Sequence, residues 1–345
     1  NCLVMNKNVV NEEWSFGAVF AFMRTTSQSP RLRETLVTVA ITNRHCVPKM
    51  RTRAKMGIVA SDRARRENVP RYIFRRKFHM AKIGFIGMGN MGTAIMRGLL
   101  KTYQPEELLF TSAHEAKMQK ITEETGVAHV STANECAEQV KYLVLAVKPQ
   151  VLPTVFKELN GKIRKDQVVI SIAAGYAIAD LQAGLGESAR IVRSMPNTPA
   201  MVGEGMSGVS YDEALFTDEE KDVIDGFFTS FGKMEKVDEK LMDVVGSASG
   251  CSPAYVYMFI EALADGCVKN GLPRQAAYKM VAQAVLGSAK MVLETGKHPG
   301  ELKDMVCSPG GTTIEGLAAL EENGFRGAII KACDANFEKN KKLKG

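Results

Sequence analysis

Three glycines with the spacing Gly87-x-Gly89-x-x-Gly92 are the residues of this chain that most directly indicate chemistry. At a turn from a strand into a helix, the first glycine permits the tight bend, the second lets backbone N–H groups approach a phosphate, and the third lets the helix pack close to the strand. An apolar run before the loop and a helical stretch after it supply that context. The loop therefore predicts binding of a dinucleotide pyrophosphate by Gly87, Met88, Gly89, Asn90, Met91 and Gly92.

The residues at the end of the second predicted strand, 108–111, bear on which dinucleotide is bound. Enzymes that use NAD usually carry an acidic residue about 20 positions after the glycines, where it binds the ribose hydroxyls. Thr111 and Ser112 stand there instead, and their small hydroxyl side chains leave room for a 2′-phosphate. We therefore expect NADPH as the cofactor, with NADH as the alternative because Glu115 is close by. His114 is expected to be the exposed start of the next helix.

Four apolar runs of strand type, 82–86, 108–111, 142–147 and 168–172, alternate with helical stretches. This alternation is typical of a parallel, doubly wound sheet, in which ligands bind at the carboxyl ends of the strands. The residues after the third and fourth runs are therefore expected beside the nicotinamide or its ribose, although Lys148 is equally well explained as a surface charge. The remaining residues that we expect to bind the cofactor are Asn134, Ala146, Val147, Lys148, Pro149, Ala173, Ala174 and Gly175.

Two later loops carry groups suited to an acidic substrate. Asn197, in a loop bent by two prolines, can offer a side-chain amide, although that loop is also explained as a simple turn. The loop 308–313 combines hydroxyls, a glycine pair and the start of a helix, which together form a nest for a carboxylate. A helix N-cap with a tight turn is the alternative explanation, but it does not require so many hydroxyls and glycines. The residues that we expect to bind substrate are Asn197, Ser308, Gly310, Gly311, Thr312 and Thr313.

Beyond about residue 240 the sequence pattern becomes helical. Residues 255–266 are apolar nearly all round, which predicts a buried helix, and a second helix is expected after Pro273. A long apolar helix in a chain of this kind often forms a dimer core. The sequence therefore predicts an α/β fold with an N-terminal Rossmann-type doubly wound parallel sheet at 80–240, followed by an all-α substrate and dimerisation domain at 241–345.

The composition argues against several other classes of protein. Of the 345 residues, 45% are hydrophobic and 24% are charged, which is ordinary for a globular protein. The net charge of +7 comes from residues 1–79, which hold 16 Lys and Arg against 5 Asp and Glu, whereas the rest holds 29 against 33. No nucleic-acid partner is therefore expected, and no apolar run approaches the roughly 20 residues that span a bilayer. Seven scattered cysteines without a C-x-x-C pair predict a reducing compartment and no metal site.

Residues 1–79 do not read as a domain, because they are rich in arginine and show no sustained strand or helix period. Met80 is a natural start, since the first predicted strand opens directly after it. We therefore expect 1–79 to be a disordered or non-native extension. An organelle transit peptide and a basic arm for nucleic acid are the alternatives. The expected location is the cytoplasm, or an organelle if the head is a transit peptide.

Taken in order, the motifs of residues 80–345 resemble those of the pyrroline-5-carboxylate reductase family. The resemblance covers nearly all of that range, and its last motif is highly specific. The motifs are the glycine loop, Ala-Val-Lys-Pro at 146–149, Met-Pro-Asn-Thr-Pro at 195–199, Pro-Ala-Tyr at 253–255, Glu-Ala-Leu-Ala-Asp-Gly at 261–266, Gly-Leu-Pro-Arg at 271–274, and the run from His298 to Thr313.

The resemblance implies reduction of 1-pyrroline-5-carboxylate to L-proline, the last step of proline biosynthesis, with NADPH or NADH. It also implies homodimers interlocked through their helical halves, which can assemble further into a higher homo-oligomer. By position, the loop 308–313 would hold the substrate carboxylate, and Thr313 and Ser308 would be the catalytic residues, with Thr313 near the ring nitrogen. The run 247–253 departs from many relatives, which have more glycine and no cysteine there.

Hydride transfer to a protonated cyclic imine does not demand a strong acid from the protein, which chiefly aligns the two reactants. Two other functions are compatible with the glycine loop. A 3-hydroxyacid dehydrogenase resembles this chain in its first half, but its class carries a catalytic lysine on a helix, and 250–266 contains no lysine. A non-catalytic NADP-binding protein would have no use for the loop 308–313.

Overall fold

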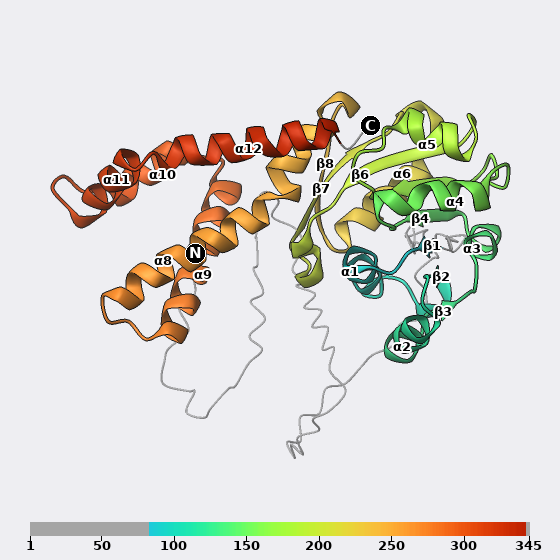
Figure 1. Ribbon diagram of the computed structural model, residues 1–345, viewed down its shortest axis with the longest axis horizontal. Coiled ribbons are helices and arrows are strands. Elements are labelled where there is room, and N and C mark those ends of the chain that lie inside the picture. The colour runs from blue at the N-terminus through green and yellow to red at the C-terminus, as the bar shows by residue number, and fades with distance from the viewer. Residues whose placement is uncertain (1–82, 343–345) are drawn as a thin grey trace, which may run out of the picture. The chain divides into compact units, whose positions relative to one another are not determined.

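The computed structural model describes residues 83–342. The interpretations of residues 1–79 as an extension and of Met80 as a start lie outside the described residues. Within 83–342, the first part is an eight-stranded sheet covered by helices and the second part is entirely helical (Figure 1).

The sheet has the strand order β3-β2-β1-β4-β5-β6-β7-β8. The chain starts at β1 in the interior, winds outwards to β3, and then returns to β4 on the other side of β1, which is the topology of a doubly wound fold. In register, Ile83 of β1 lies between Leu108 of β2 and Tyr142 of β4. The strands are β1 Ile83–Ile86, β2 Leu108–Thr111, β3 Ala128–His129, β4 Tyr142–Leu145, β5 Val168–Ser171, β6 Arg190–Met195, β7 Gly205–Ser210 and β8 Gly232–Lys236.

Helices cover both faces of this sheet, because alternate side chains of each strand are buried against opposite layers. Phe85 of β1 belongs to a core shared with α1, α2 and α6, whereas Ile86, the next residue, belongs to a core shared with α3, α4 and α5. The helices are α1 Asn90–Leu99, α2 Glu115–Thr125, α3 Ala133–Gln139, α4 Leu152–Leu159, α5 Ile178–Leu185 and α6 Asp218–Thr229 (Figure 1).

The sheet is mostly parallel, and β7 is the exception to the predicted all-parallel arrangement. It runs antiparallel to β6, with Ser194 opposite Val209, and β8 then pairs parallel with β7. The connection from β6 to β7 is a loop with a single 3₁₀ turn, Thr198–Val202, and antiparallel neighbours need no longer crossover.

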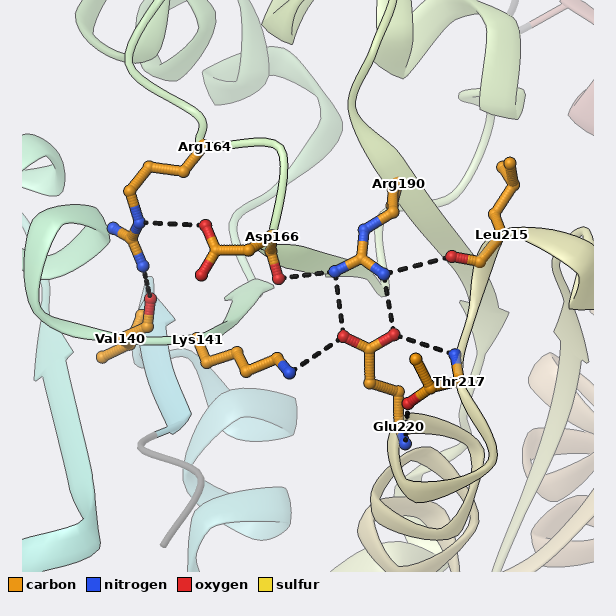
Figure 2. Close-up of polar contacts among 8 residues, drawn as sticks. All are labelled: Val140, Lys141, Arg164, Asp166, Arg190, Leu215, Thr217 and Glu220. Carbon is orange, nitrogen blue, oxygen red and sulfur yellow. Dashed lines mark hydrogen bonds and ion pairs between the residues drawn. The ribbon is translucent and has the colours of Figure 1, made fainter. Parts of the chain in front are cut away.

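A buried ion cluster joins α6 to the amino ends of β4, β5 and β6 (Figure 2). Both guanidinium Nη atoms of Arg190 donate to the carboxylate of Glu220, at 2.7 and 3.0 Å, and Lys141 approaches the same carboxylate at 2.9 Å. Arg190 also donates to the backbone oxygens of Asp166 and Leu215. The Glu220 side chain is only 4% exposed, so these partners replace the water it loses.

The cluster sets the protonation state of its carboxylate. Burial by itself raises the pKa of Glu220, but hydrogen bonds from Arg190 and Lys141 and from the backbone N–H of Thr217 outweigh burial and lower the pKa to about 2. Glu220 is therefore ionised over the whole neutral range. The cluster has a structural role, and it lies at the amino ends of the parallel strands, away from their carboxyl ends.

The second part of the chain begins with the short helix α7 Met242–Val245 and a π-helical turn, Gly246–Gly250. Long helices follow, and none of the described helices is long and apolar enough to cross a membrane. They are α8 Ser252–Lys269, α9 Arg274–Thr295, α10 Pro299–Val306, α11 Thr312–Glu322 and α12 Phe325–Lys342.

The prediction that the helix at 255–266 is buried is wrong for a single chain. In α8 only Ala264 is fully buried, while Tyr257 and Met258 are 58% and 73% exposed. The buried apolar cluster between α8 and α9 consists of Ala264, Ala277 and Val281. The helix forms as the apolar pattern predicts, but no surface within residues 83–342 covers its apolar side chains.

Candidate active site

The glycine loop has the geometry that its spacing predicts. Gly87 has φ +97°, a conformation that other residues rarely adopt, and an added Cβ would lie 2.7 Å from Val147. An added Cβ at Gly92 would lie 2.6 Å from the carbonyl oxygen of Gly87, so the helix could not approach the loop with any larger residue. At Gly89 no described heavy atom outside the adjoining main chain lies within 4 Å of an added Cβ, which leaves room for a ligand beside the main chain.

The start of α1 is suited to an anion. Its N-cap is Gly89, no side chain caps it, and its first turn contains no acidic residue. The first backbone N–H groups of a helix have no partner within the helix and carry partial positive charge. Asn90 and Met91 offer these groups, whereas the Met88 side chain is buried in the core, so Met88 can contact a ligand only through its main chain.

A pocket of about 540 Å³ opens at the carboxyl ends of β1, β2 and β4. It brings together five of the residues predicted to bind the cofactor from widely separated parts of the sequence, which are Gly87, Thr111, Ser112, Asn134 and Val147. The carboxyl ends of parallel strands flanking a change of winding direction are where doubly wound folds bind nucleotides. The residues present therefore fit the adenosine half of a dinucleotide whose pyrophosphate lies at the glycine loop.

Three residues at the end of β2 and the start of α2 have defined surroundings. The backbone oxygen of Thr111 accepts a hydrogen bond from Gly87 N–H at 2.9 Å, so this residue also fixes the loop. The carboxylate of Glu115 lies 3.2 Å from Nε2 of His129 on β3 and does not line the pocket. His114 is an exposed residue at the start of α2, as predicted.

The remaining predicted cofactor residues surround the loop or follow β5. Ala146 packs against Gly92, 3.3 Å from its added Cβ, and Lys148 is exposed before the turn that opens at Pro149. Ala173, Ala174 and Gly175 form the turn after β5, with Gly175 at φ +83°. None of Lys148, Pro149 and the 173–175 turn lines the pocket, so their contacts with a cofactor stay a prediction.

Sequence reasoning missed part of the pocket wall. Ser131 and Thr132 line it from the segment after β3, a position that the rule of strand carboxyl ends could have found. Glu158 and Lys162 line it from α4 and the segment that follows it, and both are exposed. Exposed charged residues at the end of a helix and in the turn after it are too common to indicate a ligand site.

The loop predicted to bind substrate has a compact geometry of its own. Gly310 has φ +68°, and Gly311 is the N-cap of α11 without any side-chain cap. Gly311 N–H donates to the carbonyl oxygen of Ser308 at 3.0 Å, and an added Cβ at Gly311 would lie 2.5 Å from the Ser308 hydroxyl. Ser308, Thr312 and Thr313 are exposed. The loop thus presents hydroxyls and free helix N–H groups to the outside, as a carboxylate site requires.

This loop and the nucleotide pocket do not share residues. None of Ser308, Gly310, Gly311, Thr312 and Thr313 lines the pocket within the described chain.

Asn197 has a structural role that its sequence context did not reveal. Its Nδ2 donates to the backbone oxygen of Ser249 in the π-helical turn at 3.0 Å, and its Oδ1 accepts from Met206 N–H at 2.8 Å. The side chain therefore ties the loop after β6 to both β7 and the start of the helical part. Its binding of substrate stays a prediction.

The run 247–253 forms the π-helical turn and the start of α8. Ser247 donates to Oδ1 of Asn336 on α12 at 2.7 Å, and Nδ2 of Asn336 donates to the Cys251 thiol at 2.8 Å. Ser247 and Cys251 thus hold α12 against the turn. A π-helical turn is frequently found at a functional site.

A second ion cluster lies between β6 and the helical part. Arg193 is 4% exposed and contacts Glu239 at 3.3 Å and Asp243 at 3.4 Å. Glu239 also accepts from the backbone N–H of Ile178 at the start of α5. This cluster fixes where the chain leaves the sheet and enters the helices.

Together, the doubly wound sheet, the glycine loop and the pocket at the strand ends define an oxidoreductase of the nicotinamide-dinucleotide class. Comparison with known proteins gives the family. Residues 239–343 match the family model for pyrroline-5-carboxylate reductase dimerisation, and residues 82–175 match that for NADP oxidoreductase, coenzyme F420-dependent. The dimerisation model indicates that the chain forms homo-oligomers.

Individual relatives align with this chain over nearly their whole lengths. The pyrroline-5-carboxylate reductase of Escherichia coli K12 is 47% identical over 264 residues, 76% of this chain and 98% of that protein, and the one from Arabidopsis thaliana is 42% identical over 76% and 95%. The chain belongs to the pyrroline-5-carboxylate reductase family. The solved reductase of Coxiella burnetii is 33% identical with a TM-score of 0.71, over 77% of this chain and 99% of that one. The Plasmodium falciparum enzyme, solved with NADP bound, is 34% identical with a TM-score of 0.70, over 77% and 98%.

Proposed function

We propose that this chain catalyses the reduction of 1-pyrroline-5-carboxylate to L-proline, the last step of proline biosynthesis, with NADPH as the reductant and NADH as the alternative. The observation that carries the proposal is the 47% identity to a pyrroline-5-carboxylate reductase over 98% of that protein. The glycine loop and the loop 308–313 support it, since they supply a dinucleotide site and a carboxylate site.

The reduced nicotinamide, when bound, supplies a hydride for the carbon of the substrate C=N bond. The residues of this chain bind and orient the substrate, because a cyclic imine that is protonated near neutral pH needs no strong acid. The N–H groups at the start of α11 and the Ser308 hydroxyl bind the substrate carboxylate. The Thr313 hydroxyl then lies near the ring nitrogen, where it accepts a hydrogen bond from the protonated imine.

We further propose that the protein acts as a homodimer formed through α8–α12, with higher homo-oligomers built from it. Two observations support this interface. The helical part has only a small buried core of its own, and large apolar side chains such as Met258, Leu293 and Ile330 are 61% to 83% exposed. Exposed apolar area on this scale marks a protein interaction surface.

The same proposal includes a division of labour between residues 80–240, which bind the cofactor, and residues 241–345, which bind substrate and the second copy. It also includes a cytoplasmic location. The five described cysteines, at positions 136, 251, 267, 307 and 333, are all free thiols, as is usual in a reducing compartment.

One assay tests the activity. The purified chain is mixed with NADPH, and the loss of nicotinamide absorbance is followed when 1-pyrroline-5-carboxylate is added. We expect rapid oxidation of NADPH and formation of L-proline. Bound NADPH without oxidation would contradict the proposal and favour a non-catalytic NADP-binding protein. Oxidation of NADPH by the carbonyl compound that corresponds to a 3-hydroxyacid, but not by the imine, would favour a 3-hydroxyacid dehydrogenase.

A further inference from the structure

Asn134 lines the nucleotide pocket at the start of α3, and its amide group has an uneven set of hydrogen bonds. The Nδ2 atom donates to Oε1 of Glu138, one helical turn further on, at 2.8 Å. The Oδ1 atom is closed off from solvent and has no hydrogen-bond partner among residues 83–342. Because Oδ1 is buried, it is not available to a ligand, whereas Nδ2 carries two hydrogens and the bond to Glu138 uses only one of them.

Glu138 determines which way round this amide lies. Rotation of the amide by half a turn would place Oδ1 opposite the Glu138 carboxylate, and two acceptors without a hydrogen between them repel each other. The orientation with Nδ2 towards Glu138 is therefore the one that Glu138 selects. It is selected although it leaves a buried Oδ1 unpaired, which is normally unfavourable.

An amide that offers N–H groups distinguishes the two dinucleotides. The 2′-phosphate of NADPH presents oxygens that accept hydrogen bonds, and the Ser112 hydroxyl in the same pocket can donate to them as well. The 2′-hydroxyl of NADH is uncharged and can donate as well as accept a hydrogen bond, so a fixed N–H donor strengthens NADH binding less.

We propose that Glu138 is a positioning residue that holds the N–H side of the Asn134 amide towards the pocket and thereby favours NADPH over NADH. The proposal rests on the proposed function of this pocket as the cofactor site. Glu138 does not line the pocket and acts through Asn134. Its negative charge acts in the opposite direction, because it repels a 2′-phosphate. The orienting effect and the charge effect therefore differ in sign and can be separated.

The experiment measures binding of each nucleotide to the full chain without substrate, from the change in nicotinamide fluorescence. Glu138→Ala removes both the acceptor and the charge, and we expect NADPH to bind about fivefold more weakly, a change typical of one hydrogen bond, with NADH affinity nearly unchanged. Glu138→Gln keeps an acceptor oxygen and removes the charge, so NADPH should bind as tightly as to the unchanged chain, or more tightly.

A double variant tests whether Glu138 affects NADPH binding through Asn134. With Asn134→Ala already present, Glu138→Ala should weaken NADPH binding no further. The proposal is overturned if Glu138→Ala tightens NADPH binding, weakens both nucleotides equally, or weakens NADPH just as much without the Asn134 amide. Failure of NADPH to bind to the unchanged chain would instead overturn the proposed cofactor site.

Discussion

Single residues of the glycine loop meet two separate requirements, room for the main chain and room for a ligand. At Gly92 the carbonyl oxygen of Gly87 lies 2.6 Å from an added Cβ, so the space is taken by the protein itself. At Gly89 that space is free of described atoms other than those of the adjoining main chain. Alanine at these two positions should therefore have different consequences.

We expect Gly92→Ala to lower the melting temperature and to weaken NADPH binding, because α1 must shift away from the loop. Gly89→Ala should leave the melting temperature nearly unchanged and weaken NADPH binding about tenfold, because its methyl group lies where the pyrophosphate approaches. Thermal unfolding and nucleotide titration of the two variants test this. Equal loss of stability in both variants would contradict the distinction.

Thr313 is the second prediction for a single residue. Thr313→Ala removes the hydroxyl proposed to contact the ring nitrogen, and turnover should fall about tenfold or more while NADPH binding persists. Thr313→Ser keeps the hydroxyl and should retain most of the turnover. Steady-state rates and NADPH titration distinguish these effects, and an unchanged rate in the alanine variant would remove Thr313 from the mechanism.

Among structural elements, the ion cluster under α6 allows a prediction about pH. The pKa of Glu220 is lowered from 4.5 to about 2, so its contribution to stability is complete above about pH 4.5 and is lost as the pH falls towards 2. Glu220→Gln should lower the free energy of unfolding at pH 7 by about 3 kcal/mol. The difference from the unchanged chain should shrink in acid.

An exposed glutamate provides the control for this prediction. Glu213 pairs with Lys236 at 3.0 Å, but its side chain is 57% exposed, so Glu213→Gln should cost little. Urea unfolding at pH 7 and at pH 4 measures both variants. A Glu220→Gln penalty as small as that of Glu213→Gln would show that the buried cluster does not stabilise the fold.

Most of the sheet could be predicted from the sequence, because a buried parallel strand is a short apolar run between turns. The predicted strand at 108–111 coincides with β2, and the predicted strand at 82–86 differs from β1 by one residue. The edge strand β8 was not predicted, since the sequence Gly-Lys-Met-Glu-Lys has little apolar character. The π-helical turn was also missed, because a run of Gly, Ser and Ala is equally typical of a loop.

The candidate site was predictable where residues follow strands and not where they act through tertiary contacts. Gly87, Ser112 and Asn134 do line one pocket. The clamp formed by Asn197 between Ser249 and Met206 depends on segments that meet only after folding. The contribution of α4 to the pocket depends in the same way on how that helix packs.

At the scale of the whole molecule, the helical part requires a partner in the proposed dimer. Met258→Glu places a charge on an apolar face that is 73% exposed in one chain, so we expect monomers with nearly normal NADPH binding and much reduced turnover. Leu215→Glu makes the same change at a residue 46% exposed in the sheet part and should leave association intact. Sedimentation and rate measurements test both variants, and a fully active Met258→Glu monomer would contradict the proposed dimer.

The small core of Ala264, Ala277 and Val281 has a consequence for the newly made protein. Until it meets a second copy, a chain would display apolar helices to chaperones and proteases, as unfolded proteins do. Since encounter between copies depends on the square of their concentration, slow synthesis should yield disproportionately little surviving protein. The abundance of this protein in a cell should therefore rise more steeply than its rate of translation.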